Sequence, residues 1–206
     1  MDARLQKRYL QLVREQMNAA QTVAAGLKAL PGTAQAFAAT QAAWRFFANE
    51  RVTLPKLIEP LRAVGCQSVR ESPSRYTLLV HDWSKMDYDG HTTKKDLVQL
   101  SNERDWGYEQ MTALLVDAAS GNPLAPMEVT VWAADGLHTT RHDQVQKPVG
   151  HLEQVLPTMQ ASRSWGVDKT VVHVIDREAD SVKHFRKWIQ DGHLFLYSWC
   201  ASMIAE

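Results

Sequence analysis

Long apolar runs are missing from this 206-residue sequence: no stretch approaches the roughly 18 consecutive apolar residues that a bilayer-spanning helix needs. The first ten residues, Met1 to Leu10, also lack an apolar core followed by a small-residue cleavage site, so no secretory signal is expected. These absences argue against a membrane or secreted protein. They indicate a soluble chain that remains in the cytoplasm.

Cysteine is scarce as well. The only two cysteines, Cys66 and Cys200, lie far apart and lack the short spacing of a metal site. Such a pair gives no disulfide framework and is typical of a reducing compartment. With 45% hydrophobic and 22% charged residues, the composition is that of a globular protein rather than a disordered one.

Net charge is absent, because 23 Lys and Arg residues balance 23 Asp and Glu residues. A nucleic-acid-binding protein usually has a basic excess, so the total argues against that class. The distribution is uneven, however. Residues 1–75 carry 11 basic and 5 acidic side chains, whereas residues 76–206 carry 12 and 18. We therefore expect a basic region over 1–70 and an acidic region over 75–206, with different partners.

The basic region shows helical periodicity from its start. Apolar residues at helical spacing predict one long helix over 3–30. Thr33 can cap a second helix, and its aromatic residues Trp44, Phe46 and Phe47 are expected in the core rather than on a nucleic-acid-binding surface. This region is predicted to be entirely helical.

A third helix is predicted to begin after Thr53 and to end at Gly65, a residue type that often terminates helices. Pro60 lies inside it, so a kink or an early end is expected there. Its expected inward face consists of Leu54, Leu57, Ile58, Leu61 and Val64.

The pattern changes after Pro73 to short apolar runs separated by turns and two helical segments. Ser120-Gly121-Asn122-Pro123 is a strong turn signal and predicts a hairpin between two of these runs. The predicted order is a strand at 77–81, a hairpin of 111–117 and 127–133, a helix at 151–161, a strand at 170–175, a helix at 177–190 and a strand at 193–197. This alternation indicates an α/β (α+β) fold with a mixed sheet.

Two aspartates directly follow predicted strands. Asp82 follows Leu78-Leu79-Val80-His81, and Asp176 follows Val171-Val172-His173-Val174-Ile175. If the two strands are neighbours, both carboxylates emerge at one edge and can hold Mg²⁺, which prefers oxygen ligands. Alternatively, each Asp is a turn residue or a helix cap.

Five segments, in order along the chain, match motifs of one known family. The most specific, Val174 to Asp180, contains Asp-Arg-Glu-Ala-Asp and resembles the signature of bacterial insertion-sequence transposases of the IS-four type. The other four segments are Asp2-x-Arg4-Leu5-x-x-Arg8; Trp44-Arg45-Phe46-Phe47 with Asn49; His81-Asp82-Trp83-Ser84 with Asp87, Tyr88 and His91; and Gly107-Tyr108 through Asp117 to Pro126.

The resemblance implies an RNase H-like catalytic fold of the Asp-Asp-Glu class. It assigns Asp82 and Asp176 as the first two catalytic residues, which bind Mg²⁺ or Mn²⁺, with two ions in a complete site. Arg177, Glu178 and Asp180 match the rest of the signature and are expected to support the site or the fold. In this family, water cleaves a DNA strand at the transposon end, and the freed 3′-hydroxyl then attacks another phosphodiester.

The family's third catalytic residue, a Glu in a later Tyr-Arg-Glu-Lys type motif, has no match in this sequence. The resemblance therefore implies a truncated, catalytically incomplete transposase that ends in an apolar tail. The partners it implies, besides DNA, are a second copy of the chain or a full-length transposase. Two alternatives remain: an inactive DNA-binding or transposase-binding fragment that inhibits transposition, and a decayed reading frame.

The DNA contacts are expected in the basic region. Arg4, Arg8 and Arg14 lie on its first predicted helix and can bind phosphates, which set the register of a protein on DNA without reading sequence. A solvated helix face explains them nearly as well. His138 and His142 are expected to lie in a loop rather than to bind zinc.

Overall fold

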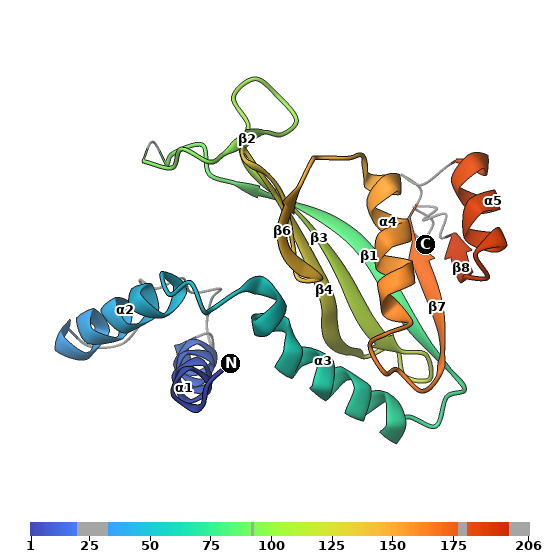
Figure 1. The fold of residues 1–206 in the computed structure, drawn as a ribbon, viewed down its shortest axis with the longest axis horizontal. Coiled ribbons are helices and arrows are strands. Elements are labelled where there is room, and N and C mark those ends of the chain that lie inside the picture. Colours follow the sequence, from blue (N-terminus) through green and yellow to red (C-terminus); the bar gives the residue numbers. More distant parts are fainter. Residues whose placement is uncertain (20–32, 92, 177–180, 198–206) are drawn as a thin grey trace, which may run out of the picture. The chain divides into compact units, whose positions relative to one another are not determined.

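The computed structural model describes residues 1–19, 33–91, 93–176 and 181–197 (Figure 1). The chain forms two compact units, Met1–Lys56 and Leu57–Glu206. In the described part of the chain, no helix is both long enough and apolar enough to span a membrane. The functional regions expected at 1–70 and 75–206 remain predictions.

The first unit contains helices α1 (Ala3–Ala19) and α2 (Thr33–Phe47). Asp2 caps α1, because its Oδ1 accepts a hydrogen bond from the Leu5 backbone N–H at 3.0 Å. Residues 20–32, in the second half of the predicted long helix, lie outside the described residues. On α2, Phe46 is buried as predicted, but Trp44 and Phe47 are 69% and 61% exposed. The core prediction was therefore wrong for these two side chains.

Helix α3 (Leu54–Glu71) is longer than the sequence predicts, since it continues through both Pro60 and Gly65. Gly65 does not end the helix. It is buried, and a Cβ at this position would lie 2.9 Å from Met127 Sδ and 3.1 Å from Ala125 Cβ. The residue is small because α3 lies very close to the sheet there. The expected inward face was partly wrong as well: Ile58 is buried, but Val64 is exposed.

The second unit is built on one mixed sheet with the strand order β6-β5-β4-β3-β1-β7-β8, while the short β2 pairs with β3. Its elements after α3 are β1 (Tyr76–Asp87), β2 (Val98–Gln99), β3 (Trp106–Asp117), β4 (Pro123–Ala133), β5 (Gly136–Thr139), β6 (His142–Gln146), α4 (His151–Ser162), β7 (Thr170–Ile175), α5 (Val182–Gln190) and β8 (Leu194–Tyr197). The mixed α/β fold is thus confirmed.

The predicted hairpin is also confirmed as the antiparallel pair β3 and β4. Two strand predictions were wrong. The first strand does not end before Asp82 but continues to Asp87, because it pairs with β3 along its length. Moreover, His138 and His142 lie on strands β5 and β6 rather than in a loop.

Helices α3, α4 and α5 supply the side chains that pack on one face of this sheet (Figure 1). Val69 on α3 packs in a cluster with Leu79 of β1, and Met159 on α4 packs with Ile175 of β7. From α5 the buried residue is Trp188, whereas its neighbour Ile189 is 64% exposed. Strand residues on this face alternate with residues on the other face of the sheet.

Three buried histidines form part of the core. His81 Nε2 and His173 Nδ1 are 3.0 Å apart, within hydrogen-bonding distance, and the His173 ring packs edge-on against His193. Burial lowers the pKa of His81 to about 3, and burial together with the neighbouring histidines lowers that of His173 to about 2. Both rings are therefore neutral at pH 7. His173 is thus a core residue.

We predict that Gly65→Val lowers the free energy of unfolding by about 1–3 kcal/mol, because the added side chain would overlap Ala125 and Met127. Urea denaturation measures this change. Ala63→Val on the same helix is the matched control, since Ala63 is exposed. Equal stability of the two variants would contradict the close approach of α3 to the sheet.

A second prediction concerns acid. An unfolded histidine gains its proton near pH 6.5, but folded His81 and His173 do not until about pH 3 and 2. The two neutral histidines contribute fully to the free energy of unfolding above pH 6.5. This contribution falls as the pH falls, by about 1.4 kcal/mol per pH unit for each histidine. Denaturation between pH 7 and 5 should show this slope. The slope of the free energy of unfolding against pH should flatten in the double variant His81→Phe/His173→Phe and persist in the control His138→Asn. An unchanged slope in the double variant would refute the prediction.

Candidate functional site

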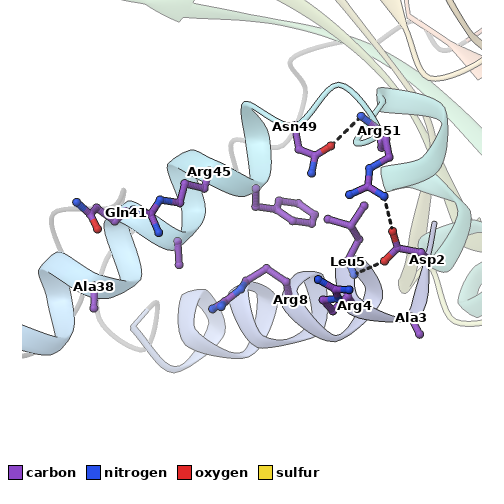
Figure 2. A pocket seen from close by; sticks show the side chains of 12 residues that line it. Asp2, Ala3, Arg4, Leu5, Arg8, Ala38, Gln41, Arg45, Asn49 and Arg51 are labelled. Atoms are coloured by element: carbon purple, nitrogen blue, oxygen red, sulfur yellow. Dashed lines mark hydrogen bonds and ion pairs between the residues drawn. The ribbon is translucent and has the colours of Figure 1, made fainter.

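A basic pocket of about 1110 Å³ lies between α1 and α2 in the first unit (Figure 2). Figure 2 shows Arg8 on α1 and Arg45 on α2 reaching into the space between the two helices. The residues that line the pocket are Asp2, Ala3, Arg4, Leu5, Arg8, Ala38, Gln41, Ala42, Arg45, Phe46, Asn49 and Arg51. Four of these are arginines and one is acidic, so the lining has a strong positive excess.

The floor and one end of this pocket are held in place by specific contacts. The ring of Phe46 on α2 stacks on Tyr9 of α1 with centroids 6.1 Å apart. At the end near the start of α1, Arg51 Nη1 lies 3.0 Å from Asp2 Oδ2. The Leu5 N–H, followed by the charge of Arg51, lowers the pKa of the Asp2 carboxyl. Asp2 thus remains ionised and neutralises part of the charge of Arg51.

Arg51 is paired with Asp2, but no described residue forms a salt bridge at the pocket with Arg4, Arg8 or Arg45. Arg8 Nη1 donates a hydrogen bond to the neutral amide of Gln11 at 3.1 Å, which leaves its charge uncompensated. Guanidinium groups arranged in this way suit phosphate oxygens, which accept paired N–H donors. The pocket is therefore electrostatically suited to a polyanion.

The structure brings together two of the three arginines that the sequence singled out for DNA. Arg4 and Arg8 line the pocket, whereas Arg14 is exposed further along α1 and does not. Sequence reasoning missed Arg45 and Arg51. Arg45 was detectable, because it belongs to the aromatic-Arg-Phe segment already matched to the family, but only the packing of α1 against α2 places it beside Arg8.

The two candidate catalytic aspartates lie in or directly after neighbouring strands of the second unit. Strands β1 and β7 pair in parallel up to His81 opposite Ile175. Asp82 is the next residue within β1, whereas β7 ends at Ile175 and Asp176 directly follows it. Both aspartates are exposed. The two strands are thus neighbours, as the sequence-based hypothesis requires, although Asp82 lies within a strand rather than after it; the pairing of the two carboxylates stays a prediction.

Side-chain alternation places Asp82 on the face opposite the α3–α5 helices, because its neighbour His81 is buried on the helix side. On β8, Leu194 and Leu196 are 52% and 55% exposed. They lie opposite Val172 and Val174 of β7, so this face of the sheet also has exposed apolar side chains.

Two carboxylates fit the ligand preferences of Mg²⁺, which commonly takes one or two carboxylates and completes its shell with water and phosphate oxygens. In the described part of the chain, no third His, Cys, Asp or Glu joins them in a metal-binding group. Three other residues of the signature, Arg177, Glu178 and Asp180, lie outside the described residues.

Trp83, next to Asp82, packs inside the protein. Its indole stacks on the His151 ring with centroids 4.7 Å apart, and His151 Nε2 lies 3.0 Å from Glu109 Oε2. These contacts favour a packing role over base stacking. His138 lies 2.9 Å from Asp135 Oδ1, consistent with an ordinary surface pair rather than a zinc ligand.

Comparison with known proteins gives a match within the first unit. Residues 1–52 match the family described as transposase DNA-binding. No curated protein matches the chain. The matched segment contains the whole arginine-lined pocket between α1 and α2. This match supports a transposase-related DNA-binding role, with DNA as the partner.

Proposed function

We propose that this protein is a transposase of the insertion-sequence IS-four type that binds transposon-end DNA through its first unit and cleaves and transfers DNA strands through Asp82 and Asp176. The observation that carries the proposal is the arginine pocket of α1 and α2, which lies entirely within the segment that matches transposase DNA-binding. The mixed sheet, with Asp82 in β1 and Asp176 directly after the neighbouring β7, supports an RNase H-like catalytic domain.

In this proposal, Arg4, Arg8 and Arg45 bind backbone phosphates. Their contacts set affinity and orientation, while base edges would be read by neutral side chains of the same pocket, of which Gln41 and Asn49 have both donors and acceptors. Arg51 is held by Asp2 and by Lys56, whose Nζ donates to the Arg51 carbonyl at 3.0 Å. Its role is to fix the end of the pocket.

Asp82 within β1 and Asp176 directly after β7 would hold Mg²⁺ or Mn²⁺. When bound, such ions supply positive charge that activates an attacking oxygen and stabilises the leaving one. The two side chains position the reacting phosphate, and their exposure gives a DNA strand access. Phosphoryl transfer depends on such positioning rather than on a protein nucleophile.

A second candidate function is an inactive DNA-binding protein that inhibits transposition by occupying transposon ends or by pairing with a full-length transposase. One observation favours it: the match to transposase DNA-binding covers residues 1–52, which contain the arginine pocket but neither aspartate. The two functions share the DNA-binding step and differ in strand cleavage.

We predict that Arg8→Gln and Arg45→Gln each weaken binding of duplex DNA about tenfold at low salt, since a charge-assisted contact contributes about 1.5–3 kcal/mol. Each should also lower the slope of log affinity against log salt by about 0.9. Fluorescence anisotropy measures both quantities. Arg104→Gln, an exposed arginine of the second unit, is the control and should change neither. Equal effects in all three variants would contradict a DNA site in this pocket.

A further prediction concerns the carboxylates. Mn²⁺ should raise the melting temperature of the protein and support nicking of DNA that carries the inverted-repeat ends. Asp82→Asn and Asp176→Asn should abolish both effects because each removes an anionic ligand. Asp143→Asn, an exposed aspartate on β6, should retain them.

The two readouts separate the candidate functions. Metal binding without nicking would favour the inhibitor, and a Mn²⁺ response that survives both substitutions would refute the assignment of the carboxylates.

A further inference from the structure

A second arginine-rich pocket, of about 560 Å³, lies wholly within the second unit. It is bounded by α3, by Arg141 in the turn between β5 and β6, and by the segment after α4 that contains Trp165. Arg62 and Arg70 line it from α3, and Glu59 is the one acidic residue of the lining. No sequence pattern indicates this pocket, since its residues are dispersed over more than 100 positions.

Arg62 is held rigidly at this pocket by neutral partners. Its Nε donates to the Met127 carbonyl at 2.7 Å, and its Nη2 donates to the Thr140 carbonyl at 3.4 Å. The guanidinium also lies over the Trp165 ring, 5.2 Å from the centroid. Carbonyls and an indole fix the orientation of the group but do not neutralise its charge. Because the group is already ordered, it would lose little conformational freedom on binding an anion.

The nearest buried carboxylate, Glu128, is already used by another arginine. Arg141 Nη1 forms an ion pair with Glu128, and it also donates to Thr158 Oγ1 at 3.1 Å. The Glu128 side chain is completely buried, so one inaccessible negative charge serves both Arg62 and Arg141. On the lining itself, three guanidiniums face one carboxylate, Glu59, whose charge also acts on Arg62.

Arg70 adds a third guanidinium, at the exposed side of the pocket. Its Nε lies 3.5 Å from Asp168 Oδ2, and both side chains are at least half exposed. A pair of this kind contributes little to stability and exchanges readily with another anion. Arg70 can therefore turn to a ligand without a large cost.

We propose that this pocket binds a phosphate group of a nucleic-acid backbone, held by Arg62, Arg70 and Arg141. The inference rests on the proposed function for the choice of ligand, and on the fixed guanidiniums for the site. The pocket lies on the helix-covered side of the sheet, where Cys66 and Trp165 pack, whereas Asp82 alternates with the buried His81 along β1 and faces the opposite side. The bound phosphate is thus not the reacting one. It belongs to a second DNA segment that wraps around or crosses the second unit.

The test uses the full chain with a carboxylate placed in the pocket. Ala63 is exposed and lines the pocket, so Ala63→Glu should repel a phosphate without disturbing the core. Val64→Glu is the matched control, because it adds the same charge at the next residue of α3, which does not line the pocket. Arg70→Gln tests the same site by removing a donor.

Fluorescence anisotropy with duplex DNA, measured between about 50 and 200 mM salt, gives the slope of log affinity against log salt. This slope should be lower by about 0.9 for Arg70→Gln. Ala63→Glu should bind DNA more weakly than Val64→Glu. The Trp165 indole NMR signal, assigned with Trp165→Phe, should shift on adding the duplex. The proposal would be overturned if the variants left DNA binding and its salt slope unchanged and the duplex left the Trp165 signal unshifted.

Two other outcomes are informative. If inorganic phosphate alone shifts the Trp165 signal while the DNA slopes stay unchanged, the pocket binds a free anion and the proposal is wrong. If DNA binding is sensitive to Arg8→Gln but not to the pocket variants, the proposed function stands and this inference fails; a wild-type chain that binds no DNA contradicts the proposed function itself.

Discussion

The parallel pairing of β1 with β7 is the contact on which both the core and the candidate catalytic face depend. It puts His81 and His173 within hydrogen-bonding distance beneath the helices, and Asp82 and Asp176 are the residues that follow the last pair of this ladder. Because side chains alternate along a strand, a shift of β1 by one residue would bury Asp82 and expose His81. The buried histidine pair thus helps to fix the register on which the exposure of Asp82 depends.

The balanced total charge conceals two surfaces of different character. The first unit gathers Arg4, Arg8 and Arg45 around a pocket in which only Asp2 opposes them, and Asp2 is occupied by Arg51. The proposed function uses two exposed carboxylates of the second unit, Asp82 and Asp176, and acidic groups of this kind are suited to metal ions that bridge them to phosphate. Net charge is therefore a poor guide to nucleic-acid binding when the phosphate-binding and metal-binding groups lie on one chain.

Sequence patterns predicted the parts of the fold that depend on local signals. The turn at 120–123 fixed the hairpin, and the β-branched run before Asp176 fixed β7. Errors arose where tertiary packing decides. Gly65 looks like a helix terminus in the sequence, but it is small because α3 touches Ala125 and Met127. Likewise, Arg45 joins Arg8 only because two helices pack together, and the pocket at Arg62 requires residues from three separate elements.

The central claim is that Asp82 and Asp176 form one metal-binding pair on a protein whose first unit binds DNA. The most direct measurement is an anomalous difference map from crystals of the full chain grown with Mn²⁺. The account predicts a peak between the two carboxylates, with oxygen ligands from both side chains. A Mn²⁺ peak elsewhere, with the two aspartates separated or facing the helix-covered side, would contradict it.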